Sequence, residues 1–293
     1  MPSIKEIPFN PSMQGLSRLQ SDVVFASPGG VPLLCSIFTP WCEDPARRWP
    51  AIVFLQGSAW MTPDRYYELP QLARYADAGY VVMSITHRNC KEGHPWPAFL
   101  QDAKTAIRYL RANAEKYRVD PERIGFWGTS SGGTTAMLVQ LTADDPAFRT
   151  EDYPDQSDRV TCCVECFGPT DMARVLQDFR AARPVSTTRA KRADRLDAVF
   201  AHLSRGMDER ETARSMSPFY RICDGMPYPP ILMLGGDDDD LVDYQTQTLR
   251  MYERYLAAGT AAQLIRVAGG PHEGAFWSRA VHDEILKFWQ THL

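Results

Sequence analysis

The sequence lacks an excess of either charge, and it lacks any long apolar run. Its 293 residues carry 32 basic and 36 acidic side chains, which gives a net charge of −4. This balance disfavours nucleic-acid binding, and no run approaches the roughly 18 apolar residues of a membrane-spanning helix. Residues 1–20 also lack the apolar core of a signal peptide. We therefore expect a cytoplasmic protein that binds neither nucleic acid nor a membrane.

The seven cysteines are odd in number, which favours free thiols over a disulfide framework. Cys163 and Cys166 have the C-x-x-C spacing of a metal or redox site, and Cys162 adds a third sulfur. The alternative is a buried strand, residues 160–167, in which cysteine serves as a small apolar residue. No second pair of metal-ligating residues lies nearby in the sequence, so we predict the strand and no metal.

Short apolar runs alternate with helical patterns along the chain. Residues 51–55 are a predicted strand buried on both faces, 80–85 and 229–234 are further predicted buried strands, and 103–117 is a predicted helix. This alternation predicts a single α/β domain over residues 1–293, with a mostly parallel sheet of about eight strands flanked by helices. An Arg- and Ala-rich segment, residues 178–212, has no strand pattern and is predicted to be a helical insertion. It is either a lid or a solvated connecting helix.

Residues 128–132 read Gly-Thr-Ser-Ser-Gly and match the pattern G-x-S-x-G. An apolar strand pattern precedes them and a helical pattern follows. Strand, sharp turn and helix are the context of a nucleophile elbow, in which the central serine is exposed at the edge of a sheet. The bare pattern is also compatible with a simple glycine-rich turn, so Ser130 becomes a candidate nucleophile only together with a base and an acid.

Candidates for both partners follow later strands. His272 lies in a glycine-rich loop directly after the last predicted strand, residues 263–267, whereas His282 lies in the final predicted helix, residues 275–289, where we expect it to face solvent. Residues 237–243 read Asp-Asp-Asp-Asp-Leu-Val-Asp after a buried strand. One of these aspartates would orient the histidine, and Asp243 is expected to cap the next helix. The spacing does not match a calcium-binding loop.

Residues 56–60, Gln-Gly-Ser-Ala-Trp, follow the first central strand. Acyl transfer needs preorganised N–H donors for the oxyanion, and we expect them at Ser58, Ala59 and Ser131. Gln56, Gly57, Trp60 and His87 are candidates for the substrate pocket. Trp60 would either pack beneath the loop or form a wall of the pocket.

Taken together, these segments resemble the α/β-hydrolase superfamily, and within it the bacterial carboxylesterases related to hormone-sensitive lipases and to acetyl- and feruloyl-esterases. The resemblance covers roughly residues 30–290. It rests on these segments: Gly57–Trp60, Thr86-His87-Arg88, Pro95-Trp96-Pro97, residues 120–124, the elbow, Ser217-Pro218, Gly236-Asp237-Asp238-Asp239 and His272. The resemblance implies that Asp239 is the triad acid, with Asp237 as the alternative, and that Ser130 and His272 complete the triad.

The implied activity is hydrolysis of a small-molecule ester without metal or cofactor, by a monomer or a homo-oligomer. An amidase, an arylformamidase or a peptidase would use the same triad, and a catalytically silent ligand-binding protein is the alternative from another class. The chain departs from the family pattern at Gln56, where the family has histidine, and at Ser58, where it has glycine. His87 likewise replaces the usual aromatic residue.

Overall fold

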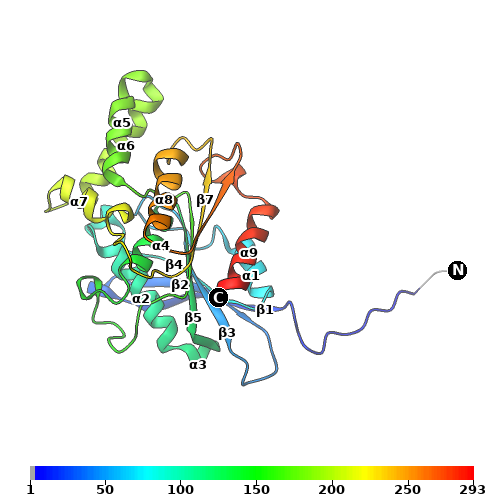
Figure 1. Cartoon of the computed structure of the whole chain (residues 1–293). Helices are drawn as coiled ribbons and strands as arrows, with labels where there is room; N and C mark the ends of the chain where they lie inside the picture. Colours follow the sequence, from blue (N-terminus) through cyan, green and yellow to red (C-terminus); the bar gives the residue numbers. More distant parts are fainter. Residues whose placement is uncertain (1–3) are drawn as a thin grey trace.

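The computed structural model describes residues 4–293, in which one sheet lies between two layers of helices (Figure 1). The strand order is β1-β2-β4-β3-β5-β6-β7-β8. β1 and β2 form an antiparallel hairpin, β2 pairs antiparallel with β4, and all later pairs are parallel. The eight strands are β1 (Ser17–Ala26), β2 (Leu33–Pro40), β3 (Trp49–Leu55), β4 (Val81–Ile85), β5 (Val119–Thr129), β6 (Cys163–Cys166), β7 (Ile231–Gly236) and β8 (Ala262–Val267).

The central strands are apolar on both faces because helices cover both. In β3, Ala51, Val53 and Leu55 face one core, while Ile52 and Phe54 face the other. A strand buried on both sides has no polar face, which explains its continuous apolar run. The predicted mostly parallel sheet of about eight strands is confirmed.

Two sets of helices form the outer layers. Side chains of α1 and α9 pack in one core, and those of α2, α4 and α8 pack in the other. The helices that flank the sheet are α1 (Leu69–Asp77), α2 (Ala98–Ala112), α3 (Ala114–Tyr117), α4 (Ser131–Leu141), α8 (Arg250–Ala257) and α9 (Arg279–His292). The helix predicted over 103–117 divides at Asn113 into α2 and α3, because the chain turns there before it enters β5.

The final helix corrects one expectation from the sequence. His282 is 6% exposed rather than solvent-facing, and its Nδ1 lies 3.0 Å from the hydroxyl of Tyr75. Its ring also stacks on Trp277 at 5.2 Å between centroids. Burial lowers the pKa of His282 to about 4. The prediction was wrong because the polar atom of this histidine is satisfied by a partner on α1, which is distant in sequence.

The cysteine-rich segment is a buried strand, as predicted. Cys163 and Cys166 bound β6, both are fully buried, and all seven cysteines are free. Burial raises the pKa of Cys162 to about 12, so its thiol stays protonated. Within residues 4–293, no group of three or more His, Cys, Asp or Glu side chains is arranged to hold a metal ion.

Three helices between β6 and β7 extend beyond the sheet layer. They are α5 (Met172–Ala182), α6 (Thr187–Leu203) and α7 (Glu209–Ser215). Figure 1 shows α5 and α6 as an upright pair above the carboxyl ends of the strands. This helical region begins with α5 at Met172, before the predicted start at 178. Across the described chain, no helix combines the length and apolar character needed to cross a bilayer.

Candidate active site

Ser130 occupies a strained turn between β5 and α4. Its φ is 52° and its ψ is −122°, outside the regions that a residue with a side chain ordinarily adopts. The turn is tight because glycines flank it. A methyl group added to Gly128 would lie 1.9 Å from the carbonyl oxygen of Gly132, and one added to Gly132 would lie 2.1 Å from that of Leu55. The glycines of the pattern are therefore required by close backbone contacts.

A chain of two hydrogen bonds connects three of the residues selected from the sequence. The Oγ of Ser130 lies 2.9 Å from Nε2 of His272, and Nδ1 of His272 lies 2.8 Å from Oδ2 of Asp239. A carboxylate can only accept, so Nδ1 carries the proton and Nε2 presents its lone pair to the serine. In this state, the imidazole is oriented to take a proton from Ser130.

Asp239 is itself held by backbone donors. Its Oδ1 accepts hydrogen bonds from the N–H groups of Leu241 and Val242, at 2.8 and 2.9 Å, which leaves Oδ2 for the histidine. The side chain of Asp239 is buried, and that of His272 is 11% exposed. The carboxylate is thus fixed in one orientation, which in turn fixes the ring.

The other aspartates of this segment have different partners. Asp237 accepts from the backbone N–H of Gly269 at 2.5 Å and faces Arg266 at 3.6 Å. Asp243 accepts from the N–H of Thr246 at 2.8 Å and so caps the helical segment that follows, as expected. The geometry therefore brings Asp239, and not Asp237, to His272.

The loop after β3 is bonded directly to the nucleophile turn. The N–H of Gly57 donates to Oγ1 of Thr129, and the N–H of Ser58 donates to Oγ of Ser131, both at 2.9 Å. The N–H of Ser58, one of the three expected oxyanion donors, therefore already has an acceptor. Ala59, with a φ of 49°, lines the cavity beside Ser130 together with Ser131.

A cavity of about 430 Å³ opens in front of Ser130 and His272. Trp60 forms part of its wall, and its other walls come mainly from α5, α6 and the loop after β7. The side chains from these three elements that line it are Met172, Val175, Phe179, Arg192, Arg195, Leu196, Val199, Leu241 and Val242. Helices α5 and α6 thus contribute seven of the fifteen residues that line the cavity.

Three of the four expected pocket residues, Gln56, Gly57 and His87, do not line this cavity. The Oε1 of Gln56 accepts from the N–H of Asp64 at 2.9 Å and so ties the loop to the segment that follows. His87 is 4% exposed, with Nε2 3.4 Å from Oγ of Ser58, and burial lowers its pKa. These side chains support the loop after β3, whereas Trp60 and Ala59 face the cavity.

The residues of α5 and α6 that line the cavity were not selected from the sequence. One signal was present, since Arg192, Leu196 and Val199 recur at the spacing of a single helical face. The sequence could not show which face of that helix turns toward Ser130, because this depends on how the helix pair packs above the sheet.

Comparison with known proteins assigns the chain to a family. The BD-FAE family model matches residues 36–254, and the chain belongs to this family. The esterase LipC of Mycobacterium tuberculosis is 30% identical over 260 residues, which cover 85% of this chain and 60% of LipC. The probable carboxylic ester hydrolase LipM of the same organism is 28% identical over 197 residues, covering 67% of this chain and 42% of LipM. The chain thus spans at most 60% of the length of these relatives.

Solved structures of similar shape confirm the α/β-hydrolase fold. A truncated form of a carbohydrate esterase from gut microbiota superposes with a TM-score of 0.76 at 28% identity, covering 96% of this chain and 98% of that one. Thermogutta terrifontis esterase 2, in a butyrate-bound structure, superposes with a TM-score of 0.72 at 24% identity, covering 96% of this chain and 95% of its own. The similarity to the Thermogutta esterase, at 24% identity, supports the fold alone.

Proposed function

We propose that this protein is a carboxylic ester hydrolase that works through an acyl-enzyme on Ser130. The observation that carries the proposal is the pair of short contacts, 2.9 and 2.8 Å, that link Ser130, His272 and Asp239 at the mouth of a cavity. Membership of the BD-FAE family and the esterase names of the relatives support the same activity. The substrate is a small-molecule ester, and α5 and α6 act as a lid over it.

In the first half-reaction, Nε2 of His272 takes the proton of Ser130, and Oγ attacks the ester carbonyl. Asp239 stabilises the imidazolium that forms and holds its orientation. His272 then returns the proton to the departing alcohol, which leaves an acyl group on Ser130. In the second half-reaction, His272 activates a water that releases the acid and restores the serine.

The negative charge on the carbonyl oxygen needs donors that are in place before the reaction. Ser131 lies at the first turn of α4, where the unpaired N–H groups and the helix dipole favour an anion. The N–H groups of Ser131 and Ala59 are the proposed donors, since both residues face the cavity. The N–H of Ser58 contributes indirectly, by binding the hydroxyl of Ser131 and fixing the distance between the loop and the turn.

The direct test replaces Ser130 and follows both activity and labelling. We expect Ser130→Ala to lower kcat for 4-nitrophenyl acetate by about 10⁴-fold or more, because no other group supplies the acyl acceptor. A fluorophosphonate probe should add one adduct to the native protein, measured by intact mass and mapped to Ser130, and none to the variant. Ser12→Ala, at an exposed serine far from the site, is the matched control and should behave as the native protein.

Two results would contradict the proposal. One is full ester hydrolysis by Ser130→Ala, and the other is labelling of a different residue. A labelled Ser130 with no ester turnover would favour an amidase or arylformamidase, which a panel of amides and formyl-kynurenine would identify. A protein that is neither labelled nor active would be a ligand-binding member of the fold.

A further inference from the structure

One face of α6 gives the cavity a positive end. Arg192, Arg195, Leu196 and Val199 all line it, and their spacing places them along a single helical face. The two arginines come first along the helix and the two aliphatic residues follow. The α6 wall of the cavity is therefore cationic toward the start of the helix and apolar toward its end.

The two arginines differ in whether their charge is matched. Arg192 pairs with Asp240, its Nη1 lying 2.5 Å from Oδ2. Arg195 is exposed, and across residues 4–293 its guanidinium has no hydrogen-bond or ion-pair partner. Arg195 thus presents an uncompensated charge at the rim of the cavity.

The acidic neighbours of Arg195 on α6 are bound elsewhere. Asp197 pairs with Arg180 at 2.8 Å and also with Arg183, while Asp194 pairs with Arg183 at 2.9 Å. These contacts direct the carboxylates of α6 toward α5 and the turn that follows it. This network connects the helix pair, and of the two arginines that line the cavity Arg195 is the one left to meet a bound anion.

Apart from the catalytic groups, Ser131 and Trp60, the remaining walls offer no polar side chain to a substrate. Met172, Val175 and Phe179 from α5, with Val242 from the loop after β7, are apolar. A substrate that is apolar throughout would fill this part of the cavity and leave the guanidinium unmatched. A substrate with an anionic group at one end would match both ends.

We propose that the preferred esters carry a carboxylate, and that Arg195 is the residue that recognises it. The proposal rests on the ester hydrolase activity proposed above and adds the substrate class. Arginine suits this role because its planar guanidinium can donate two parallel hydrogen bonds to one carboxylate. The carboxylate belongs to either the acyl or the alcohol part of the ester, since both would extend from Ser130 into the same cavity.

The test compares two matched pairs of esters. On the acyl side, mono-4-nitrophenyl glutarate is compared with 4-nitrophenyl valerate. On the alcohol side, 3-acetoxybenzoate is compared with 3-methylphenyl acetate. For at least one pair, Arg195→Gln should lower kcat/KM of the anionic ester about tenfold, because one charge-assisted contact at an exposed site is lost. The kcat/KM of the neutral ester should change less than about twofold. The pair that responds identifies the side of the ester that carries the carboxylate.

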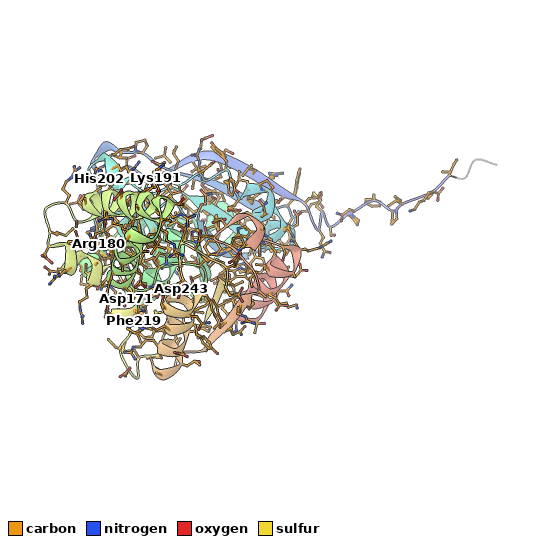
Figure 2. The ribbon with its side chains drawn as sticks, turned by 90° about the horizontal axis from the view of Figure 1, so that it is seen from above. Asp171, Arg180, Lys191, His202, Phe219 and Asp243 are labelled. Carbon is orange, nitrogen blue, oxygen red and sulfur yellow. The ribbon has the colours of Figure 1, made fainter. Side chains whose placement is uncertain are left out.

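Two further variants separate recognition from net charge. Arg195→Lys keeps the charge and should retain part of the preference for the anionic ester. Lys191→Gln removes one positive charge from an exposed position of the same helix (Figure 2), outside the cavity lining, and should leave both kcat/KM values unchanged. The preference of the native protein should also weaken as salt concentration rises, because the contact is partly exposed.

The proposal would be overturned if Arg195→Gln left the ratio of kcat/KM unchanged in both pairs, or if Lys191→Gln changed it equally. Its failure is distinguishable from failure of the proposed function. If the native protein cleaves the neutral esters and Ser130→Ala does not, the hydrolase assignment stands whatever Arg195→Gln shows. If the native protein cleaves none of the four esters, the hydrolase assignment itself fails.

Discussion

At the scale of single residues, the carboxyl of Glu165 lies buried beneath the nucleophile turn. It is 0% exposed, and its Oε2 accepts from the N–H of Gly168 at 3.0 Å, while Oε1 has no partner in the described chain. Burial raises the pKa of Glu165 from 4.5 to about 8. The folded protein therefore prefers the neutral acid, whereas the unfolded chain ionises it from about pH 4.5 upward.

This difference predicts how Glu165 affects stability with pH. Its contribution is complete below pH 4.5 and is lost as pH rises toward about 8, because the unfolded state releases the proton first. Glu165→Gln keeps the shape of the neutral acid and cannot ionise. We expect the Tm of this variant, relative to the native protein, to increase between pH 5 and pH 9 in thermal unfolding. A Tm difference that is constant over this range would contradict the prediction.

Single residues also show which features of the site and the core the sequence predicts. Local patterns predict Ser130 and His272, because each follows a strand whose carboxyl end lies at the same edge of the sheet, whereas only the family resemblance singles out Asp239 among its neighbouring aspartates. The predicted solvent exposure of His282 is wrong, because its partner Tyr75 is 207 residues away in sequence. A helix position predicts burial only when the packing of its face is known.

At the scale of elements, the loop after β3 and the nucleophile turn form one unit. They contact so closely that Gly57 cannot be replaced without displacing the serine. A methyl group added there would lie 2.4 Å from Cβ of Ser130 and 2.8 Å from the carbonyl oxygen of Thr129. The geometry of the reacting group is therefore set by a neighbouring loop as well as by its own turn.

Gly57→Ala should lower kcat for 4-nitrophenyl acetate by about 10²-fold, since misplacing a reacting group by about 1 Å has an effect of that size. Overpacking should also lower the free energy of unfolding by about 1–3 kcal/mol, measured with urea. Ser58→Ala keeps the same backbone contacts and removes only the hydroxyl contacts with the carbonyl of Met61 and with Nε2 of His87, so it should have the smaller effect on kcat. Native kcat in Gly57→Ala would show that the loop can move without cost.

At the scale of the whole molecule, a buried charge cluster joins α2 to the connection between α4 and β6. Oδ1 of Asp158 accepts from Nζ of Lys104 at 2.7 Å, and Oδ2 lies 3.3 Å from Nη1 of Arg108. All three side chains are at most 1% exposed. Among residues 4–293, Asp158 is the only carboxylate paired with both cations, so its removal would leave two buried charges without their ion-pair partner.

Asp158→Asn should therefore lower the free energy of unfolding by about 3–5 kcal/mol, the range for a broken buried ion pair, as measured by urea unfolding. Asp283→Asn provides the matched control, because Asp283 pairs with Arg74 at the surface, where both side chains are well exposed. That exposed pair should contribute less than about 1 kcal/mol. Equal losses in the two variants would show that burial does not determine the strength of these pairs.

The sequence by itself determined the sheet, the elbow and the triad candidates, because all three depend on local patterns: apolar runs, glycines in tight turns, and polar residues at strand ends. Only the tertiary structure decided which aspartate reaches His272, since Asp237 and Asp239 are two residues apart and differ in their spatial partners. It also decided that α5 and α6 face Ser130 and place Arg195 at the cavity. The packing of a helix pair above a sheet depends on contacts between distant segments, which no local pattern encodes.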